Sequence, residues 1–250
     1  MNTLETRIPP SSWRARRWLQ ACRSLGALPR QVLRFLLNPP GTLMNEKSQN
    51  HWDTVYQTKS SEQVSWFQPH ARKSLELIQR VHAPHARATV IDVGGGASTL
   101  VDDLLDCGSF DVSVLDISAA ALAVAKERLG ERAAGVQWLV GDITEIDLPE
   151  RSFDIWHDRA VFHFLTSAAQ RAAYVALVRR AVRPGGHVIV AAFGPEGPTH
   201  CSGLPVVRYA PDALHAEFGG AFELVEHSRE SHQTPAGGVQ QFVYCHCVMH

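Results

Sequence analysis

The sequence predicts a doubly wound α/β fold with a mostly parallel sheet. Short apolar runs alternate with stretches of helical periodicity from residue 89 onward, at the spacing of strand–helix–strand units. A glycine-rich turn follows the first run, at the edge where such sheets bind ligands. The last two predicted strands are joined too closely for a crossover helix, so we expect them to pair antiparallel.

Each element has a local signal. The expected strands are 89–93, 112–115, 136–140, 153–157, 187–193, 222–227 and 240–247. Residues 98–107 show helical spacing, and Ser118 offers an N-cap to a helix that Gly130 ends. Ser167 and Gln170 predict a capping box for a helix that runs through Val182 and closes at residues 183–186.

Composition favours one globular domain in a reducing compartment. The chain has 250 residues, 45% of them apolar and 20% charged. No run approaches the roughly 20 apolar residues of a membrane span, and we expect a cytoplasmic protein. The five cysteines are an odd number without framework spacing, which favours free thiols.

Residues 1–43 differ from the rest. They hold seven arginines and one acid, Glu5, for a net charge of +6, which leaves −7 for residues 44–250. We expect a basic extension that is either a disordered tail or a segment before a true start at Met44. An amphipathic targeting peptide is the alternative. The domain is predicted to span 44–250.

The glycine turn indicates a nucleoside ligand without phosphates. Gly94, Gly95 and Gly96 let a ligand lie against bare backbone, but Thr99 stands where a dinucleotide fingerprint has its third glycine. This makes a nicotinamide-dependent oxidoreductase an unfavoured alternative. Asp116 ends the second strand, where an acid can hold ribose hydroxyls, and Asp142 follows the third, where an acid can accept from an exocyclic amine.

Together, these motifs resemble the class I S-adenosylmethionine-dependent methyltransferases. The resemblance covers residues 48–250 and departs from many members at Ser98, where they have a glycine. It implies a seven-stranded sheet with an antiparallel last strand and S-adenosyl-L-methionine as cofactor. The implied cofactor-binding residues are Asp92, Gly94, Gly95, Gly96, Asp116, Ile117, Asp142 and Ile143.

The Trp52-Asp53-x-x-Tyr56 pattern and Trp66 resemble a narrower group, which includes protein lysine methyltransferases acting on elongation factors. The resemblance implies that this element caps the cofactor with Trp52, Tyr56 and Trp66. A sulfonium over an aromatic face would gain about 0.5–2 kcal/mol. Simple packing of the three rings on the sheet is the alternative.

The acceptor is expected beside the fourth strand. His157 and His163 are candidate bases, Asp158 a candidate orienting group and Arg159 a candidate ligand for an acidic acceptor. The structural alternatives are an Asp158–Arg159 ion pair and a packed core histidine at 163.

A long connection over 194–210 is expected to act as a lid, because unstructured loops of this length are uncommon in compact domains. Cys201, Arg208 and Tyr209 are the candidate acceptor-binding residues on it, although Cys201 is equally suited to fill the core. Near the C-terminus, Cys245 and Cys247 should face away from His246 in a strand, so we expect no metal there.

The acceptor class stays open between two enzymatic hypotheses. A small molecule enclosed by the lid is favoured, and a protein lysine is the alternative. A cofactor-binding protein without turnover is a hypothesis of another class. The net charge of −7 on the domain disfavours nucleic acid. A monomer or homodimer is expected.

Overall fold

The computed structural model describes residues 40–82 and 86–250, with side chains from residue 46 onward. Ser48–His250 form one compact unit, and of the preceding unit, Met1–Lys47, only the helical residues from Pro40 are described. The extension predicted for residues 1–43 therefore lies almost wholly outside the described residues. Its last four residues already belong to helix α3 (Pro40–Thr58).

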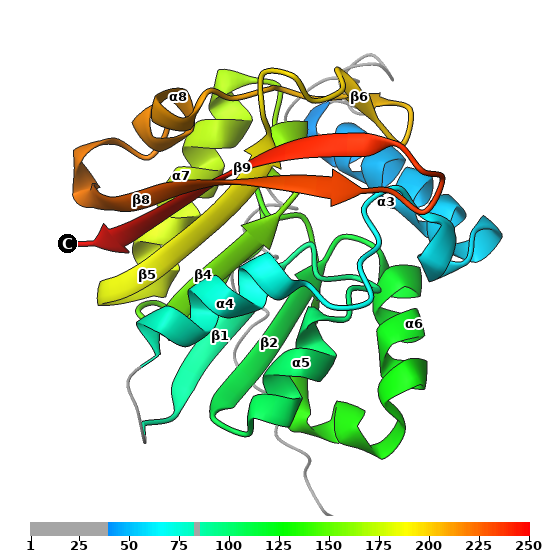
Figure 1. Ribbon diagram of the computed structural model, residues 1–250, viewed down its shortest axis with the longest axis horizontal. Coiled ribbons are helices and arrows are strands. Elements are labelled where there is room, and N and C mark those ends of the chain that lie inside the picture. The colour runs from blue at the N-terminus through cyan, green and yellow to red at the C-terminus, as the bar shows by residue number, and fades with distance from the viewer. Residues whose placement is uncertain (1–39, 83–85) are drawn as a thin grey trace, which may run out of the picture. The chain divides into compact units, whose positions relative to one another are not determined.

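A seven-stranded sheet in the order β3-β2-β1-β4-β5-β9-β8 forms the centre of the compact unit (Figure 1). Its strands are β1 (Ala88–Val93), β2 (Phe110–Asp116), β3 (Val136–Val140), β4 (Phe153–Arg159), β5 (Val182–Phe193), β8 (Phe222–Gln233) and β9 (Val239–Met249). The first five strands pair in parallel, whereas β9 runs antiparallel to both β5 and β8. The predicted doubly wound sheet with a reversed last strand is confirmed.

Helices cover both faces of the sheet (Figure 1). One core contains apolar side chains of α4 (Arg72–Val81), α5 (Leu100–Cys107) and α6 (Ala119–Leu129). The other contains those of α7 (Ala168–Ala181) and α8 (Pro211–Ala216). Short 3-10 turns lie at η2 (Ser61–Gln63), η3 (Gly130–Gly135), η4 (Phe162–Phe164) and η5 (Gly219–Ala221). None of the helices in the described residues is both long and apolar enough to cross a membrane.

The predicted helix caps at Ser118, Gly130 and Ser167 agree with the structure, whereas the helix predicted to run through Val182 ends at Ala181. The Ser118 hydroxyl accepts from the Ala121 N–H at the start of α6, and Gly130 ends that helix with φ of 57°. At α7, Ser167 and Gln170 form the reciprocal capping box. Because each cap satisfies backbone groups that the helix leaves unpaired, the boundaries follow from local sequence.

The predicted and observed elements differ most at three places. Strand β5 begins at Val182, because this residue already pairs with Phe153, rather than at residue 187. Strand β8 continues six residues past the predicted end at residue 227, since β9 pairs with it as far as Gln233. The connection over 194–210 is not irregular throughout, because it contains a small hairpin of β6 (His200–Cys201) and β7 (Leu204–Pro205).

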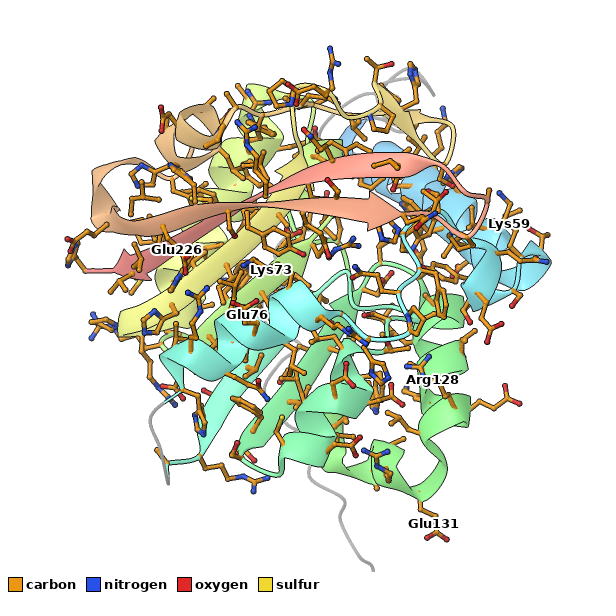
Figure 2. The ribbon with its side chains drawn as sticks, in the orientation of Figure 1. Lys59, Lys73, Glu76, Arg128, Glu131 and Glu226 are labelled. Atoms are coloured by element: carbon orange, nitrogen blue, oxygen red, sulfur yellow. The ribbon has the colours of Figure 1, made fainter. Side chains whose placement is uncertain are left out.

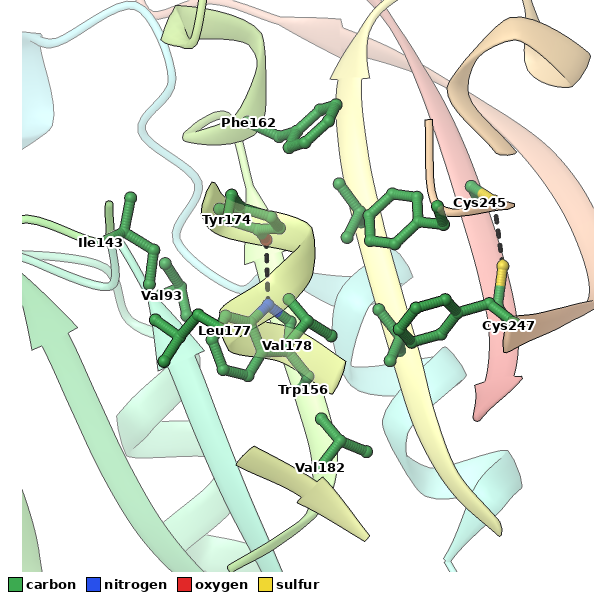
Figure 3. Close-up of a cluster of buried hydrophobic side chains, with 14 of the residues drawn as sticks. Val93, Ile143, Trp156, Phe162, Tyr174, Leu177, Val178, Val182, Cys245 and Cys247 are labelled. Atoms are coloured by element: carbon green, nitrogen blue, oxygen red, sulfur yellow. Dashed lines mark hydrogen bonds between the residues drawn. The ribbon is translucent and has the colours of Figure 1, made fainter. Parts of the chain in front are cut away.

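A buried polar contact fastens β4 to α7 within the apolar core (Figure 3). The Tyr174 hydroxyl donates to Asp158 Oδ2 at 2.7 Å and accepts from Trp156 Nε1 at 2.9 Å. All three side chains are fully buried. One hydroxyl therefore satisfies two polar groups that have no water to replace it.

Tyr174→Phe should lower the free energy of unfolding by about 2–3 kcal/mol, because it leaves the Trp156 N–H and the Asp158 carboxylate short of a partner. Tyr209→Phe is the matched control. The Tyr209 hydroxyl is buried without a hydrogen-bond partner, so its removal should be neutral or stabilising. Urea unfolding of both variants measures the difference, and equal losses would contradict this account.

Candidate active site

A pocket opens where the chain leaves β1. About 560 Å³ of space free of protein atoms lies there, open solvent included. Its lining residues are Tyr56, Ser61, Val64, Trp66, Phe67, Gln68, Ala71, Asp92, Gly94, Gly95, Ala97, Ser98, Leu100, His157 and Arg159. They come from the carboxyl ends of β1 and β4, the glycine turn, and the segment that precedes α4.

Side chains at the glycine turn would collide with the protein itself. Gly94 has φ of 69°, and an added Cβ there would overlap the Val161 side chain. A Cβ on Gly95 would lie 2.6 Å from Asp92 Oδ2, and one on Gly96 would lie 2.7 Å from Asp116 Oδ2. The glycines therefore let the backbone pass close to two buried carboxylates.

Arg128 of α6 holds the end of this turn in place (Figure 2). Its guanidinium donates to the Ala97 carbonyl at 2.9 Å and to the Ser98 carbonyl at 2.6 Å. The same group pairs with Asp102 at 2.7 Å. Ser98 thus contributes a carbonyl to this clamp, while its hydroxyl accepts from the Leu100 N–H at the start of α5.

Asp116 is a buried acid that accepts hydrogen bonds from the backbone of Ser118 and Ile117. Its Oδ1 accepts from the Ser118 N–H at 2.8 Å, and Oδ2 faces the turn at Gly96. Burial raises the pKa of Asp116 to about 7, and the nearby Asp92 and Asp53 add to the increase. Asp53 in turn accepts from the Ser118 hydroxyl at 2.6 Å. A ligand that donates hydroxyl groups would stabilise the ionised form of Asp116.

The acid predicted after β3 is hydrogen-bonded to a residue close to it in the sequence. Asp142 Oδ1 accepts from the backbone N–H and the hydroxyl of Thr144. Ile143 is buried in the core on the α7 side, and Ile117 is half-buried. Asp116, Ile117, Asp142 and Ile143 lie outside the lining of the pocket. Their assignment to the cofactor stays a prediction.

The aromatic residues before β1 form one cluster. The Trp52 ring meets Trp66 edge-on at 5.7 Å and Phe164 at 5.2 Å, and Tyr56 meets Trp66 at 6.4 Å. Burial and the nearby Asp116 raise the pKa of Tyr56 well above its ordinary range. Only Tyr56 and Trp66 of the three predicted cap residues line the pocket. Packing of these rings on the protein is thus compatible with the predicted capping of the cofactor.

Strand β4 sends its polar side chains in two directions. His157 lines the pocket, where its Nδ1 contacts Asp92 Oδ1 at 2.7 Å. Asp158 points to the opposite face and accepts from the Val161 and Phe162 N–H groups as well as from Tyr174. Burial raises the pKa of Asp158 to about 6. The expectation that Asp158 shares a site with His157 is not met, because successive residues of a strand face opposite sides.

His163 is also placed away from the pocket lining. Its Nδ1 accepts weakly from the Phe193 N–H at 3.4 Å, and its Nε2 is buried without a hydrogen-bond partner. Burial lowers the pKa of His163 to about 3, and the charge of Arg159 adds to the decrease. Its geometry is that of the packed core histidine, and it gives no support to a role as base.

Arg159 is held by four groups rather than by Asp158. It pairs with Glu230 Oε2 at 3.2 Å, donates to the Tyr244 hydroxyl and the Trp66 carbonyl, and stacks 4.2 Å from the Phe242 ring centre. Glu230 thus balances the charge of Arg159. The positive charge of Arg159 in turn lowers the pKa of Glu230.

The candidate residues on 194–210 do not gather at the pocket. Cys201 is buried, Arg208 donates to the Pro195 and Gly197 carbonyls of its own loop, and Tyr209 packs against Phe162 in the core. The residues that line the pocket from outside the sheet instead belong to the segment 56–71. The segment that borders the pocket is therefore 56–71, and not the 194–210 connection that was predicted to act as a lid.

Sequence reasoning missed several polar groups that complete the site. Gln68 lines the pocket, and Ser74, Glu230 and Tyr244 contact its polar residues. None belongs to a motif, and their partners lie far away along the chain. Only the order of strands in the sheet brings them together.

Residues 90–186 match the family described as methyltransferase domain. The eEF1A lysine and N-terminal methyltransferase of Mus musculus is 27% identical over 113 residues, which cover 45% of this chain and 16% of that protein. The ubiquinone/menaquinone biosynthesis C-methyltransferase UbiE of Methylobacterium nodulans is 31% identical over 107 residues, covering 42% of this chain and 41% of that protein. Residues 90–186 therefore carry a methyltransferase domain similar to those of class I S-adenosylmethionine-dependent methyltransferases.

The fold of this methyltransferase domain recurs among solved structures. A protein studied for the conversion of a disulfide bond into a thioacetal group during echinomycin biosynthesis superposes with a TM-score of 0.64 at 20% identity. The match covers 81% of this chain and 92% of that one. The chain spans less than half the length of the two curated relatives, so its substrates do not follow from theirs.

The glycine turn and Asp116 fit the cofactor of this methyltransferase family. Three residues without side chains would present bare backbone to an adenosyl group, and the Asp116 carboxylate beside Gly96 is an acceptor suited to ribose hydroxyls. The Asp92 carboxylate on the pocket wall suits the cofactor's ammonium group.

The pKa of Asp116 predicts how binding of S-adenosylhomocysteine depends on pH. The ligand hydroxyls bind the ionised acid, so protons compete with the ligand below a pH of about 7. The dissociation constant should therefore be about tenfold higher at pH 6 than at pH 8. Titration calorimetry across this range measures it.

Asp116→Asn should remove this pH dependence and weaken binding. Asp111→Asn is the matched control, because Asp111 lies on the same strand, is exposed, and pairs with Arg87 at 2.6 Å. An Asp116→Asn variant that keeps the pH dependence would assign it to another group.

Proposed function

We propose that this chain transfers a methyl group from S-adenosylmethionine to a small-molecule acceptor. The observation that carries the proposal is the pocket at the glycine turn, which continues from the predicted cofactor residues to a partly aromatic wall at Trp66 and Phe67. A methyltransferase needs both parts, because the cofactor and the acceptor must meet in one water-poor space.

Each part of the predicted cofactor site has a separate task in this proposal. The glycine turn admits the adenosyl group, Asp116 binds the ribose hydroxyls, and Asp92 binds the ammonium group. When bound, S-adenosylmethionine supplies an electrophilic methyl group, so the chain has to align the acceptor and exclude water. Tyr56 and Trp66 present aromatic surface to the pocket, where a sulfonium gains cation–π attraction.

The acceptor side favours a compact, uncharged molecule. Val64, Trp66 and Phe67 provide apolar surface there. The charge of Arg159 is balanced by Glu230, and its donors are engaged by protein groups. An acidic acceptor would have to displace these partners, which is costly for a nearly buried ion pair. Arg159 is therefore not expected to bind an acidic acceptor, in contrast to the role predicted from the sequence.

A protein lysine is the second candidate acceptor. It is favoured by the similarity to the eEF1A lysine and N-terminal methyltransferases and by the Trp52-Asp53-x-x-Tyr56 element. The two candidates differ in what the pocket must admit, since a lysine enters as an extended side chain while its protein stays outside.

Transfer of labelled methyl from S-adenosylmethionine into a cell extract tests the proposal. We expect label in the low-molecular-weight fraction, and Asp116→Ala should abolish most of it by weakening cofactor binding by about 1.5–3 kcal/mol. The Asp111→Ala variant should retain activity. Label confined to protein would support the lysine candidate, and tight cofactor binding without any transfer would indicate a non-catalytic binding protein.

A further inference from the structure

A continuous chain of side-chain hydrogen bonds runs from the pocket wall to the C-terminal hairpin. Asp92 Oδ1 contacts His157 Nδ1 at 2.7 Å, and His157 Nε2 contacts the Ser74 hydroxyl at 2.8 Å. Ser74 lies 3.3 Å from the Tyr244 hydroxyl, which donates to Glu230 at 3.0 Å. The chain thus joins β1, β4, α4, β9 and β8.

The middle of this chain is shielded from water. Ser74 and Tyr244 are each 1% exposed, and His157 is 2% exposed. A buried polar group that loses its partner has no solvent to replace it, so each member depends on its neighbours. Ser74 and Tyr244 do not line the pocket, although both ends of the chain, at Asp92 and at the Glu230 partner Arg159, do.

The His157 ring connects the pocket wall to α4, because its Nδ1 contacts Asp92 and its Nε2 contacts the Ser74 hydroxyl. This arrangement uses Asp92 Oδ1 and leaves Oδ2 facing the glycine turn at Gly95. Both nitrogens of His157 are engaged by protein groups, so the geometry gives no support to its predicted role as a base.

We propose that His157, Ser74 and Tyr244 form a positioning relay that fixes the Asp92 carboxylate for the cofactor and links it to the Arg159–Glu230 pair. The inference rests on the proposed function, because it gives Asp92 a cofactor to bind. In this relay His157 is a positioning residue. The β8–β9 hairpin, which contacts the acceptor side through Arg159, then influences cofactor affinity from behind the pocket wall.

Ser74→Ala tests the relay at a residue outside the pocket lining. It should weaken binding of S-adenosylhomocysteine by about 2- to 10-fold, the range of one hydrogen bond. Ser113→Ala is the matched control. Ser113 is a buried serine of β2 whose hydroxyl donates to Gln137 at 3.0 Å outside the relay. That variant should bind as tightly as the parent, as measured by calorimetry. Unchanged binding in a folded Ser74→Ala variant would overturn the proposal.

A double-mutant cycle separates positioning from a general loss of structure. If Ser74 acts through Asp92, Ser74→Ala should cause no further weakening in an Asp92→Asn background. A full additional loss in that background would overturn the relay. Tyr244→Phe keeps the ring packing and should show the same dependence on Asp92. If the Ser74→Ala variant does not fold, ligand binding by the Tyr244→Phe variant is measured in its place.

The parent protein distinguishes failure of the relay from failure of the proposed function. Absence of S-adenosylhomocysteine binding by the parent would overturn the proposed function and the relay with it. Binding by the parent together with an unchanged Ser74→Ala variant would overturn the relay alone. His157→Asn, which retains a donor near the Nδ1 position, should bind the ligand more tightly than His157→Leu.

Discussion

The packing of the glycine turn against two buried carboxylates is the constraint on which the rest of the site depends. Asp92 and Asp116 end neighbouring parallel strands, so their side chains reach the same edge of the sheet. Backbone can pass this closely only where Gly95 and Gly96 carry no Cβ. Arg128 then fixes the carbonyls that follow, and α5 starts from a defined position. Sheet, turn and helix thereby place the acids before any ligand arrives.

Strand β4 supports the fold and the site with alternate residues. Trp156 and Asp158 face α7, where the Tyr174 hydroxyl ties them together, whereas His157 and Arg159 face the pocket. Within the run His157-Asp158-Arg159, Asp158 therefore makes a core contact, while the other two residues line the pocket. Because one residue of shift would exchange the two faces, the core packing of Trp156 also fixes the direction of His157.

Local signals predicted most of the fold and only part of the site. Caps at Ser118 and Ser167 define helix starts through neighbouring backbone groups, so sequence alone locates them. The partner of Arg159 could not be predicted in this way, because Glu230 lies 71 residues further along the chain and meets it only across the strand order β4-β5-β9-β8. The 194–210 connection was correctly predicted to be long, but its docking was not. Backbone bonds from Val207 to His163 and from Tyr209 to Phe193 hold it against the core.

The acids that make the site attractive to a cofactor also weaken the free protein. Burial raises the pKa of Asp116, and the nearby Asp92 and Asp53 add to the increase, so their charges disfavour ionisation of Asp116. A cationic ligand with hydroxyl donors relieves this repulsion. Since such a ligand binds the folded state alone, the relieved repulsion contributes both to affinity and to stability of the complex. Substitutions that separate these acids would stabilise the free chain and weaken the site together, the trade-off expected where a fold stores electrostatic strain for binding.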